Sequence, residues 1–271
     1  MTAPVPPLPQ QALRAGPPPL PAQAALFIDF DGTLAPLAPR PQDVVVPIWV
    51  QPTLQHLHAA LGGALAIVSG RPVEQIDGFL APLQLPAAGV HGVERRGSDG
   101  RLQVLGGEPP AALVAAAQAL AQQHPGLLYE PKTGGFALHY RNRPLLATLC
   151  HDTLHISLGG LPEAAAWQVM GGHYVFEVKQ RRVSKGVALA ALQADPCFAG
   201  RVPVYVGDDV TDEDGIAAAQ AAGGFGIRVG PGDTQAHYWL QDIDAVARWL
   251  GEAVQRLPAV VADPPPHPSH P

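Results

Sequence analysis

The sequence predicts an α/β protein with a doubly wound parallel-sheet core and an inserted α+β cap domain. Short apolar runs at residues 25–28, 64–68 and 203–206 each end in polar residues and alternate with segments of helical spacing. Strands that alternate with helices in this way form parallel sheets covered by helices. Residues 109–179 instead repeat the order helix, strand, strand, which is typical of an antiparallel unit.

The first part of the predicted core runs from the apolar run at 25–28 to a hairpin turn at residues 98–100. Residues 34–46 are interrupted by prolines and are expected to form a surface flap. Pro47 can supply the first turn of a helix that ends at Gly62, and Pro72 can do so for the helix after the second strand. The buried stripe expected on the first of these helices consists of Ile48, Leu54, Leu57 and Leu61.

The middle of the chain predicts helices at about 109–124 and 145–158, with strands at 127–131, 136–141, 167–170 and 174–179. The last two strands are expected to be joined by Gly171-Gly172. These strands would form a four-stranded antiparallel sheet with the two helices on one face. The other face is suited to a ligand with many hydroxyl groups, although its charged residues could also be solvated surface. The charged residues on or beside these strands are Glu130, Lys132, Arg141, Glu177 and Lys179.

The parallel pattern returns after residue 184. Lys185 opens a helix, where the helix dipole disfavours positive charge, so a negative group is expected beside it. The strand at 203–206 ends in an acidic segment that contains Asp208, Asp209 and Asp212. Thr211 can cap the helix that follows, which leaves Asp208 and Asp209 without a structural reason. A strand at 224–229 and a closing helix at 243–257 complete the core; the expected buried face of that helix consists of Val246, Trp249, Leu250 and Val254.

Domain boundaries follow from these patterns. Residues 22–105 and 181–257 are expected to form the core, and residues 106–180 the inserted cap. The proline-rich segments 1–21 and 258–271 are expected to be a disordered lead-in and tail. Cys150 and Cys197 show neither a disulfide framework nor metal-ligand spacing, so each is expected to be a small buried side chain.

Composition limits the partners. The net charge of -6 argues against nucleic acid, because binding to a phosphate backbone needs clustered lysine and arginine. No apolar stretch approaches the roughly 20 residues of a membrane helix, and the N-terminus lacks the order of a signal peptide. We therefore expect a cytoplasmic protein with no membrane partner that acts on a small molecule.

The polar strand ends together predict a chemistry. In a parallel sheet, three strand ends would reach one edge, with Lys185 at a helix start beside them. These ends carry Asp29 and Asp31, Ser69, and Asp208 and Asp209. Carboxylates from two strands form a hard-oxygen site of the kind that Mg²⁺ accepts. A hydroxyl and a lysine around that ion describe a phosphate site. One carboxylate can attack a phosphoryl group and the second can transfer protons, which is the chemistry of phosphate-monoester hydrolysis.

These residues resemble the motifs of the haloacid dehalogenase superfamily of phosphohydrolases. Asp29-Phe30-Asp31-Gly32-Thr33 is similar to the first motif, Ser69 to the second, Lys185 to the third and Gly207-Asp208-Asp209 to the fourth. Within the superfamily, the chain is most similar to the trehalose-6-phosphate phosphatases, over about residues 26–250. The segments that carry this likeness are 68–71, 89–94, 129–132, 139–141, 176–178 and 207–213.

The resemblance implies a role for each site residue. Asp29 would be the nucleophile and Asp31 the general acid and base, while Ser69 and Lys185 would hold the phosphoryl group. Magnesium would be bound by Asp29, Asp208 and the backbone carbonyl of Asp31. The mobile cap would read the sugar of a phosphorylated disaccharide. Substrate contacts would come from Arg71, Glu130, Lys132, Arg141 and Glu177, with Gly70, Asp209 and Asp212 in support.

The chain departs from the family pattern at Ser184, where asparagine is usual, and at Lys179-Gln180, where Arg-Pro is expected. Asp31 argues against a dehalogenase, which needs no second aspartate. A transport ATPase would have threonine in place of Gly32 and many apolar spans. Two alternatives stay open: a phosphatase of another sugar phosphate, such as sucrose phosphate or a mannosyl phosphate, and a catalytically silent sugar-phosphate sensor.

Overall fold

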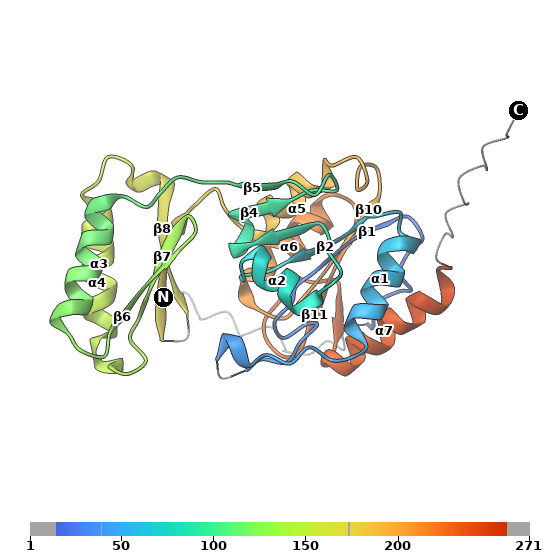
Figure 1. The fold of residues 1–271 in the computed structure, drawn as a ribbon, viewed down its shortest axis with the longest axis horizontal. Helices are drawn as coiled ribbons and strands as arrows, with labels where there is room; N and C mark the ends of the chain where they lie inside the picture. Colours follow the sequence, from blue (N-terminus) through green and yellow to red (C-terminus); the bar gives the residue numbers. More distant parts are fainter. Residues whose placement is uncertain (1–14, 39, 173, 259–271) are drawn as a thin grey trace, which may run out of the picture. The chain divides into compact units, whose positions relative to one another are not determined.

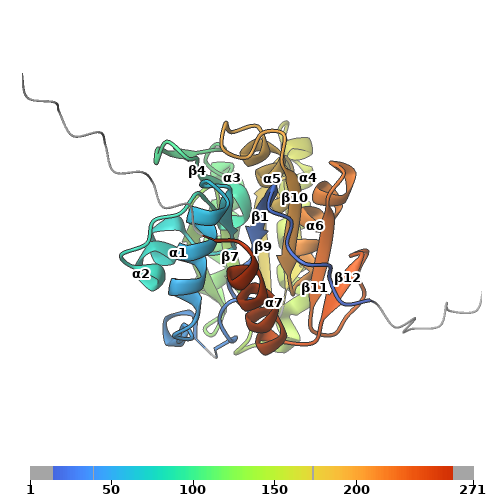
Figure 2. The ribbon, with the colours of Figure 1, turned by 90° about the vertical axis from the view of Figure 1, so that its right-hand side faces the viewer.

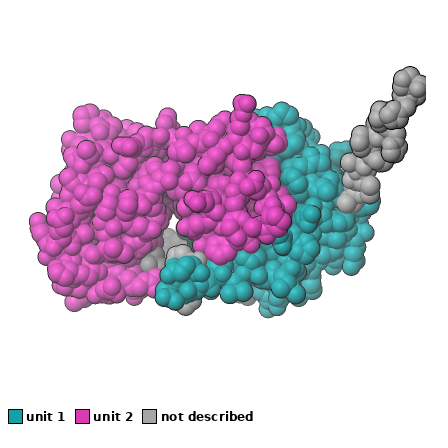
Figure 3. Space-filling model, in the orientation of Figure 1, with its two compact units in different colours: residues 1–65, 193–271 teal, residues 66–192 magenta. Residues whose placement is uncertain are grey.

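The computed structural model describes residues 15–38, 40–172 and 174–258. The chain divides into two compact units, residues 1–65 with 193–271 and residues 66–192 (Figure 3). The expected boundaries between core and cap stay a prediction. Among the described residues, no helix is both long enough and apolar enough to cross a membrane.

The proline-rich lead-in differs from the expectation at its end. Most of it, and of the predicted tail, lies outside the described residues. Residues 15–21, however, lie against the first unit: Leu20 is buried, and the Trp249 indole Nε1 donates to the Pro18 carbonyl at 2.9 Å. This end of the lead-in is therefore anchored by packing and a hydrogen bond.

The first unit contains four parallel strands in the order β12 (Tyr238–Leu240), β11 (Phe225–Val229), β10 (Val202–Gly207) and β1 (Ala24–Ile28). Every residue of β1 is buried, which explains its uninterrupted apolar run. The predicted strands at 25–28, 203–206 and 224–229 are confirmed. The short edge strand β12 was not predicted, because three residues give too little periodicity to detect.

The helices of this unit are α1 (Val50–Ala60), α6 (Glu213–Ala221) and α7 (Ile243–Arg256). Helix α1 and helix α7 lie side by side, and the His56 Nε2 is 2.7 Å from the Leu257 carbonyl oxygen (Figures 1 and 2). The predicted stripe of α1 was wrong at Ile48, which is 95% exposed. Residues 48–49 form a turn before the helix, so Ile48 does not share its buried face.

Two further details correct the expectations for this unit. The predicted flap at 34–46 contains a short 3-10 helix, η1 (Pro41–Asp43). In α7, Val246, Trp249 and Leu250 are buried as predicted, whereas Val254 is half-buried. Ala253 takes the buried position in the last turn.

The second unit begins with strands in the order β2 (Leu65–Val68), β3 (Ala87–Gly89), β4 (Glu94–Arg96) and β5 (Leu102–Val104). The pair β2 and β3 is parallel, while β4 and β5 are antiparallel around the predicted hairpin. Helix α2 (Val73–Leu80) follows β2, as predicted, and α5 (Lys185–Gln193) follows the last strand of this unit. The Glu94 carboxylate accepts the Val73 amide at 2.7 Å, which ties β4 to the start of α2.

The rest of the second unit is the four-stranded antiparallel sheet that the sequence predicts. Its order is β6 (Leu128–Lys132), β7 (Gly135–His139), β9 (Val175–Gln180) and β8 (Trp167–Gly172). Helices α3 (Ala111–Gln123) and α4 (Ala147–Gly159) cover one face of it (Figure 1). Gly171 and Gly172 belong to β8 and not to the turn after it, so the predicted joint was wrong.

The register of this sheet separates an apolar face from a charged one. Tyr129, Phe136, Leu138, Phe176 and Val178 share one face and pack against the helices. On the other face, Glu130 is in register with Ala137 and Glu177, and Lys132 with Gly135 and Lys179. The predicted division of side chains between the two faces is therefore confirmed.

The apolar core between α3, α4 and this sheet can be tested at Leu154, which is fully buried. Replacing Leu154 by alanine removes buried methyl groups and leaves a cavity, so it should lower the free energy of unfolding by about 2–5 kcal/mol. Leu145 in the segment before α4 is 98% exposed, and Leu145→Ala should change it by less than about 0.5 kcal/mol. Urea denaturation of both variants measures the difference, and equal effects would contradict this packing.

Candidate active site

A cluster of three carboxylates forms at the ends of β1 and β10. Asp29 directly follows β1, its amide donates to the Val206 carbonyl at 2.9 Å, and its side chain is almost fully buried. Asp208 directly follows β10, which pairs in parallel with β1. Carboxylate oxygens of Asp29, Asp208 and Asp212 all lie within 4.8 Å of one another. The sheet therefore brings together the acids of the first and fourth motifs.

The Gly-Thr pair of the first motif shapes this cluster. Gly32 has a φ of +81°, and a Cβ atom at this position would overlap the Asp208 carboxylate. The Thr33 hydroxyl donates to Asp208 Oδ1 at 3.1 Å. Glycine is thus required both by its backbone conformation and by the close approach of Asp208.

Asp212 is held by two donors. The Tyr205 hydroxyl donates to Asp212 Oδ1 at 2.7 Å, and the Asp209 amide donates to Asp212 Oδ2 at 3.0 Å. Burial, followed by the charges of Asp212 and Asp29, raises the pKa of Tyr205 well above its usual value. The phenol therefore keeps its proton and stays a donor. Sequence reasoning missed Tyr205, because its place in an apolar strand gives no sign of the contact.

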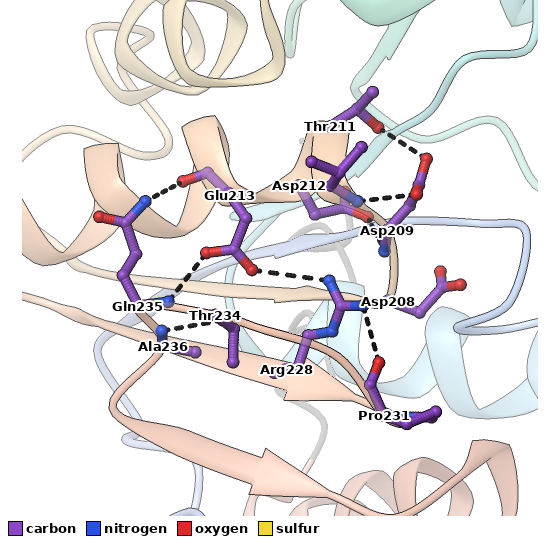
Figure 4. A network of polar contacts seen from close by, with 12 residues as sticks. Asp208, Asp209, Thr211, Asp212, Glu213, Arg228, Pro231, Thr234, Gln235 and Ala236 are labelled. Carbon is purple, nitrogen blue, oxygen red and sulfur yellow. Dashed lines mark hydrogen bonds and ion pairs between the residues drawn. The ribbon is translucent and has the colours of Figure 1, made fainter. Parts of the chain in front are cut away.

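Asp209 has the helix-capping role that was predicted for Thr211. Asp209 is the N-cap of the short helix η5 (Val210–Asp212), where its Oδ1 accepts the Val210 amide at 2.7 Å (Figure 4). Its partner in a reciprocal capping box is Asp212. Thr211 lies within η5, so its assignment as the cap was wrong. Capping explains Asp209 and leaves Asp208 available for the cluster.

A buried ion pair supports the segment beside the cluster (Figure 4). Arg228 lies opposite Gly207 in the pairing of β10 with β11, and its Nη1 is 3.5 Å from Glu213 Oε1. Its Nη2 donates to the Pro231 carbonyl at 3.0 Å. Glu213 Oε2 in turn accepts the Gln235 amide at 3.0 Å. This network fixes the loop after β11 to the start of α6.

The donor set of the cluster fits a hard cation. Its candidate ligands are carboxylate oxygens, which suit Mg²⁺ better than ions that prefer nitrogen or sulfur. Three carboxylates this close also repel one another unless a cation or shared protons offset their charge. Asp31 lies two residues after Asp29, where its backbone bridges to Ala35, and its side chain is not part of the three-acid cluster.

In the second unit, Ser69 follows β2 and is fully buried. Its amide donates to the Ala88 carbonyl at 2.8 Å, and its hydroxyl accepts the Arg71 amide at 3.1 Å. The N-cap of α2 is Pro72, so helix capping does not explain the serine at position 69. The Arg71 side chain lies along α2, with Nη1 donating to Gln75 at 3.3 Å and its guanidinium 5.0 Å from the Phe79 ring centroid.

His91 is a site residue that sequence reasoning did not single out. Val90 and His91 have φ values of 48° and 54°, and the His91 amide donates to the Ser69 carbonyl at 2.9 Å. A Cβ atom on Gly70 would lie 2.8 Å from His91 Cε1, so Gly70 makes room for the ring. The His-Gly pair at residues 91–92 was the one sequence feature that could have pointed to His91. The positive φ values of Val90 and His91 cannot be predicted from it.

The surroundings of His91 keep it neutral. Burial, followed by the positive charges of Lys179 and Lys185, lowers the pKa of His91 to about 3, and the opposing effect of Glu177 is smaller. Its Nδ1 is buried without a hydrogen-bond partner among the described residues. Its Nε2 is 3.8 Å from Glu177 Oε2.

A cavity within the second unit connects His91 to the charged face of the sheet. Gly70, His91, Lys132, Glu177 and Lys179 are among its lining residues. The Lys132 Nζ is 2.6 Å from Glu177 Oε1. Burial would raise the pKa of Glu177, but Lys132, together with His91 and Lys179, lowers it below its usual value. The cavity is therefore lined by a charged carboxylate and two lysines.

The other predicted sugar contacts lie elsewhere in the second unit. Glu130 pairs with His139, with 2.6 Å between Glu130 Oε2 and His139 Nε2. The Arg141 guanidinium is 5.9 Å from the centroid of the Tyr174 ring. Glu130, Arg141 and Arg71 do not line the cavity. Their roles stay predictions.

Lys185 is the first residue of α5 and is almost fully buried. The Ser184 hydroxyl accepts the Val187 amide at 3.3 Å, so serine can cap this helix where asparagine is usual. Lys185 is also one of the lysines whose charge lowers the pKa of His91. The meeting of Ser69 and Lys185 with the acidic cluster of the first unit stays a prediction.

Known proteins were compared with this chain. The family model of trehalose-phosphatase matches residues 27–244. The trehalose-6-phosphate phosphatase of Escherichia coli (strain K12) is 40% identical over 239 residues, which cover 86% of this chain and 87% of the relative. A probable trehalose-phosphate phosphatase of Sinorhizobium fredii is 39% identical over 212 residues, which cover 76% of this chain and 78% of the relative.

Solved structures show the same fold. The C-terminal domain of the Candida albicans trehalose-6-phosphate phosphatase matches with a TM-score of 0.70 at 20% identity, over 86% of this chain and 92% of that one. A Bacteroides thetaiotaomicron phosphatase of the haloalkanoate superfamily matches with a TM-score of 0.56 at 15% identity, over 93% and 99% of the two chains. The predicted α/β fold class is thereby confirmed. From the family model and the identity to the bacterial relatives, we conclude that the chain belongs to the trehalose-phosphatase family.

Proposed function

We propose that this protein hydrolyses trehalose 6-phosphate to trehalose and inorganic phosphate, with magnesium and through an aspartyl-phosphate intermediate. The proposal rests on the cluster of Asp29, Asp208 and Asp212, in a chain that matches the trehalose-phosphatase family over residues 27–244. Relatives at 39–40% identity are named as phosphatases of this substrate class.

Asp29 and Asp208 would hold magnesium together with the backbone carbonyl of Asp31. When bound, the ion offsets the negative charge of the phosphoryl oxygens and of the acids around it. Asp212 is better suited to support than to direct coordination, because each of its oxygens already accepts a hydrogen bond. This division of roles agrees with the all-oxygen character of the cluster.

The proposed reaction has two steps. In the first, a carboxylate oxygen of Asp29 bonds to phosphorus, the bond from phosphorus to the sugar oxygen breaks, and Asp31 gives its proton to that oxygen. In the second, water attacks the same phosphorus and transfers a proton to Asp31. Phosphate leaves, and both carboxylates return to their starting states. Ser69 and Lys185 would bind the phosphoryl oxygens through a hydroxyl and an ammonium group.

The charged face of the second unit would bind the sugar. Lys132 and Glu177 line one cavity, and a carboxylate paired with an ammonium group can accept and donate hydrogen bonds to neighbouring hydroxyls. We place Lys179 there too, because it lines the same cavity. Glu130, Arg141 and Arg71 remain proposed contacts, and residues 106–180 the proposed cap.

His91 would bind the sugar as a neutral ring. A neutral imidazole has one donor and one acceptor nitrogen, so it can either donate a hydrogen bond to a hydroxyl group or accept one from it. Its low pKa follows from burial and from the lysines beside it. The ring would then keep this state throughout the physiological pH range.

Replacing Asp29 by asparagine tests the nucleophile. The amide is a poor nucleophile, so phosphate release should fall by roughly 10³-fold or more. Asp244→Asn, at an exposed position in the first turn of α7, should leave the rate unchanged. Malachite-green detection of phosphate measures both. A silent sensor would instead show no turnover in the unchanged protein, and that result would overturn the enzymatic proposal.

The substrate and the ion are tested together by a screen of sugar phosphates with and without Mg²⁺. Trehalose 6-phosphate should give the highest kcat/KM, and removal of divalent ions by a chelator should abolish release, with recovery on adding Mg²⁺ back. A preference for sucrose phosphate or a mannosyl phosphate would refute the narrow substrate assignment and keep the phosphatase. Full activity after chelation would refute the metal dependence.

His91 makes a prediction about stability and pH. The folded chain has a pKa of about 3 at this residue and the unfolded chain about 6.5, so between these values only the unfolded chain binds the proton. Acidification in this window therefore favours unfolding. From pH 7 to pH 5, the unchanged protein should lose about 2 kcal/mol more stability than His91→Asn, a variant that tolerates the positive φ.

Urea denaturation at the two pH values measures this difference. Glu177 is present in both proteins, and its lowered pKa keeps it charged in the folded chain over this pH range. If the stability of the two proteins depended on pH in the same way, His91 would take up its proton as readily in the folded chain as in the unfolded chain, and the lowered pKa would be refuted.

A further inference from the structure

Two histidines lie on the exposed flank of α4, outside the site described above. The buried residues of this helix are Cys150, Leu154 and Leu158, which face the sheet. His151 and His155 each follow one of these positions, and both are exposed. Because they are four residues apart on a helix, their side chains project from the same side on successive turns.

The two rings are already close together. Their centroids are 4.2 Å apart with an interplanar angle of 35°. The His151 ring also meets the core ring of Phe176 edge to face, with centroids 5.8 Å apart. His151 is therefore oriented by the protein core, although nearly half of its side chain is exposed.

Hydrogen bonding selects the tautomer of His151. Its Nδ1 is 2.9 Å from Asp152 Oδ1. A carboxylate accepts hydrogen bonds and donates none, so Nδ1 is the donor in this contact and Nε2 is the nitrogen that can bind a metal. A carboxylate in this position is the usual second partner of a histidine that ligates a metal through its other nitrogen.

From this arrangement we propose a second metal site, at which His151 and His155 bind a divalent zinc-class ion such as Zn²⁺, Ni²⁺ or Cu²⁺. Two histidines spaced by four residues present their nitrogens on one helix face, and imidazole prefers these ions. Asp152 orients the His151 ring, and water completes the coordination. The oxygen-only cluster at Asp29 suits Mg²⁺, so the two sites differ in selectivity.

The site should compete with protons. Two imidazolium rings at this distance would repel each other, and each must be neutral to bind a metal. Metal binding displaces protons from the ligand nitrogens, so metal affinity should fall as the pH is lowered. Binding would also link successive turns of α4 and so raise the melting temperature with increasing metal concentration.

Calorimetric titration of the full chain with Zn²⁺ at neutral pH tests the proposal, in excess Mg²⁺ so that the carboxylate cluster is occupied. The unchanged protein should bind one Zn²⁺ ion. Each of the substitutions His151→Ala and His155→Ala should lower the affinity for this ion at least about tenfold. His237→Ala removes another exposed histidine and should leave that binding unchanged.

A double variant tests the spacing itself. His155→Ala combined with Ile156→His keeps the number of histidines but moves one off the shared flank, and it should not restore binding. Circular dichroism confirms that each variant is folded. The proposal is overturned if the unchanged chain binds no Zn²⁺, if binding survives both single substitutions, or if the displaced histidine restores it.

Discussion

Repulsion among buried carboxylates is the constraint around which the first unit is built. Asp29, Asp208 and Asp212 come within 4.8 Å of one another because β1 and β10 are parallel neighbours that end together. Like charges at this distance repel one another unless a cation offsets them. Hydrogen-bond donors hold two of these carboxylates in place: Thr33 donates to Asp208, and Tyr205 donates to Asp212. The cluster is thus prepared for a cation.

In the second unit, a single alternation of side chains serves two purposes. One face of the four-stranded antiparallel sheet is apolar and packs against α3 and α4 through Phe136 and Val178. The residues between these positions then point to the opposite face and include Lys132, Glu177 and Lys179. Since the packed face fixes the register, it also fixes which charges line the cavity. The alternation of side chains along the strands therefore links the packing of the sheet to the charges that line the cavity.

Much of the fold and part of the site could be predicted from the sequence, because strand periodicity and the polar strand ends are local patterns. The strands that carry Asp29, Ser69 and Asp208 were predicted correctly. The failures depend on geometry that local patterns do not contain. Ile48 was assigned to a helix that begins after it, and His91 was overlooked because a positive φ is not visible in its residue type. Asp209 was not predicted to be a helix cap, because the capping box that it forms with Asp212 is visible only in three dimensions.

The neutral state of His91 completes the electrostatic argument. Lys132, Lys179 and Lys185 all lower its pKa, while Glu177 alone raises it. A protonated ring here would add a fourth positive charge to a buried site and would weaken the ion pair of Lys132 with Glu177. Keeping the ring neutral leaves Glu177 paired with Lys132 and adds no further positive charge beside the lysines. A phosphate monoester with a polyhydroxylated group matches this distribution, because its anionic end and its hydroxyls need different partners.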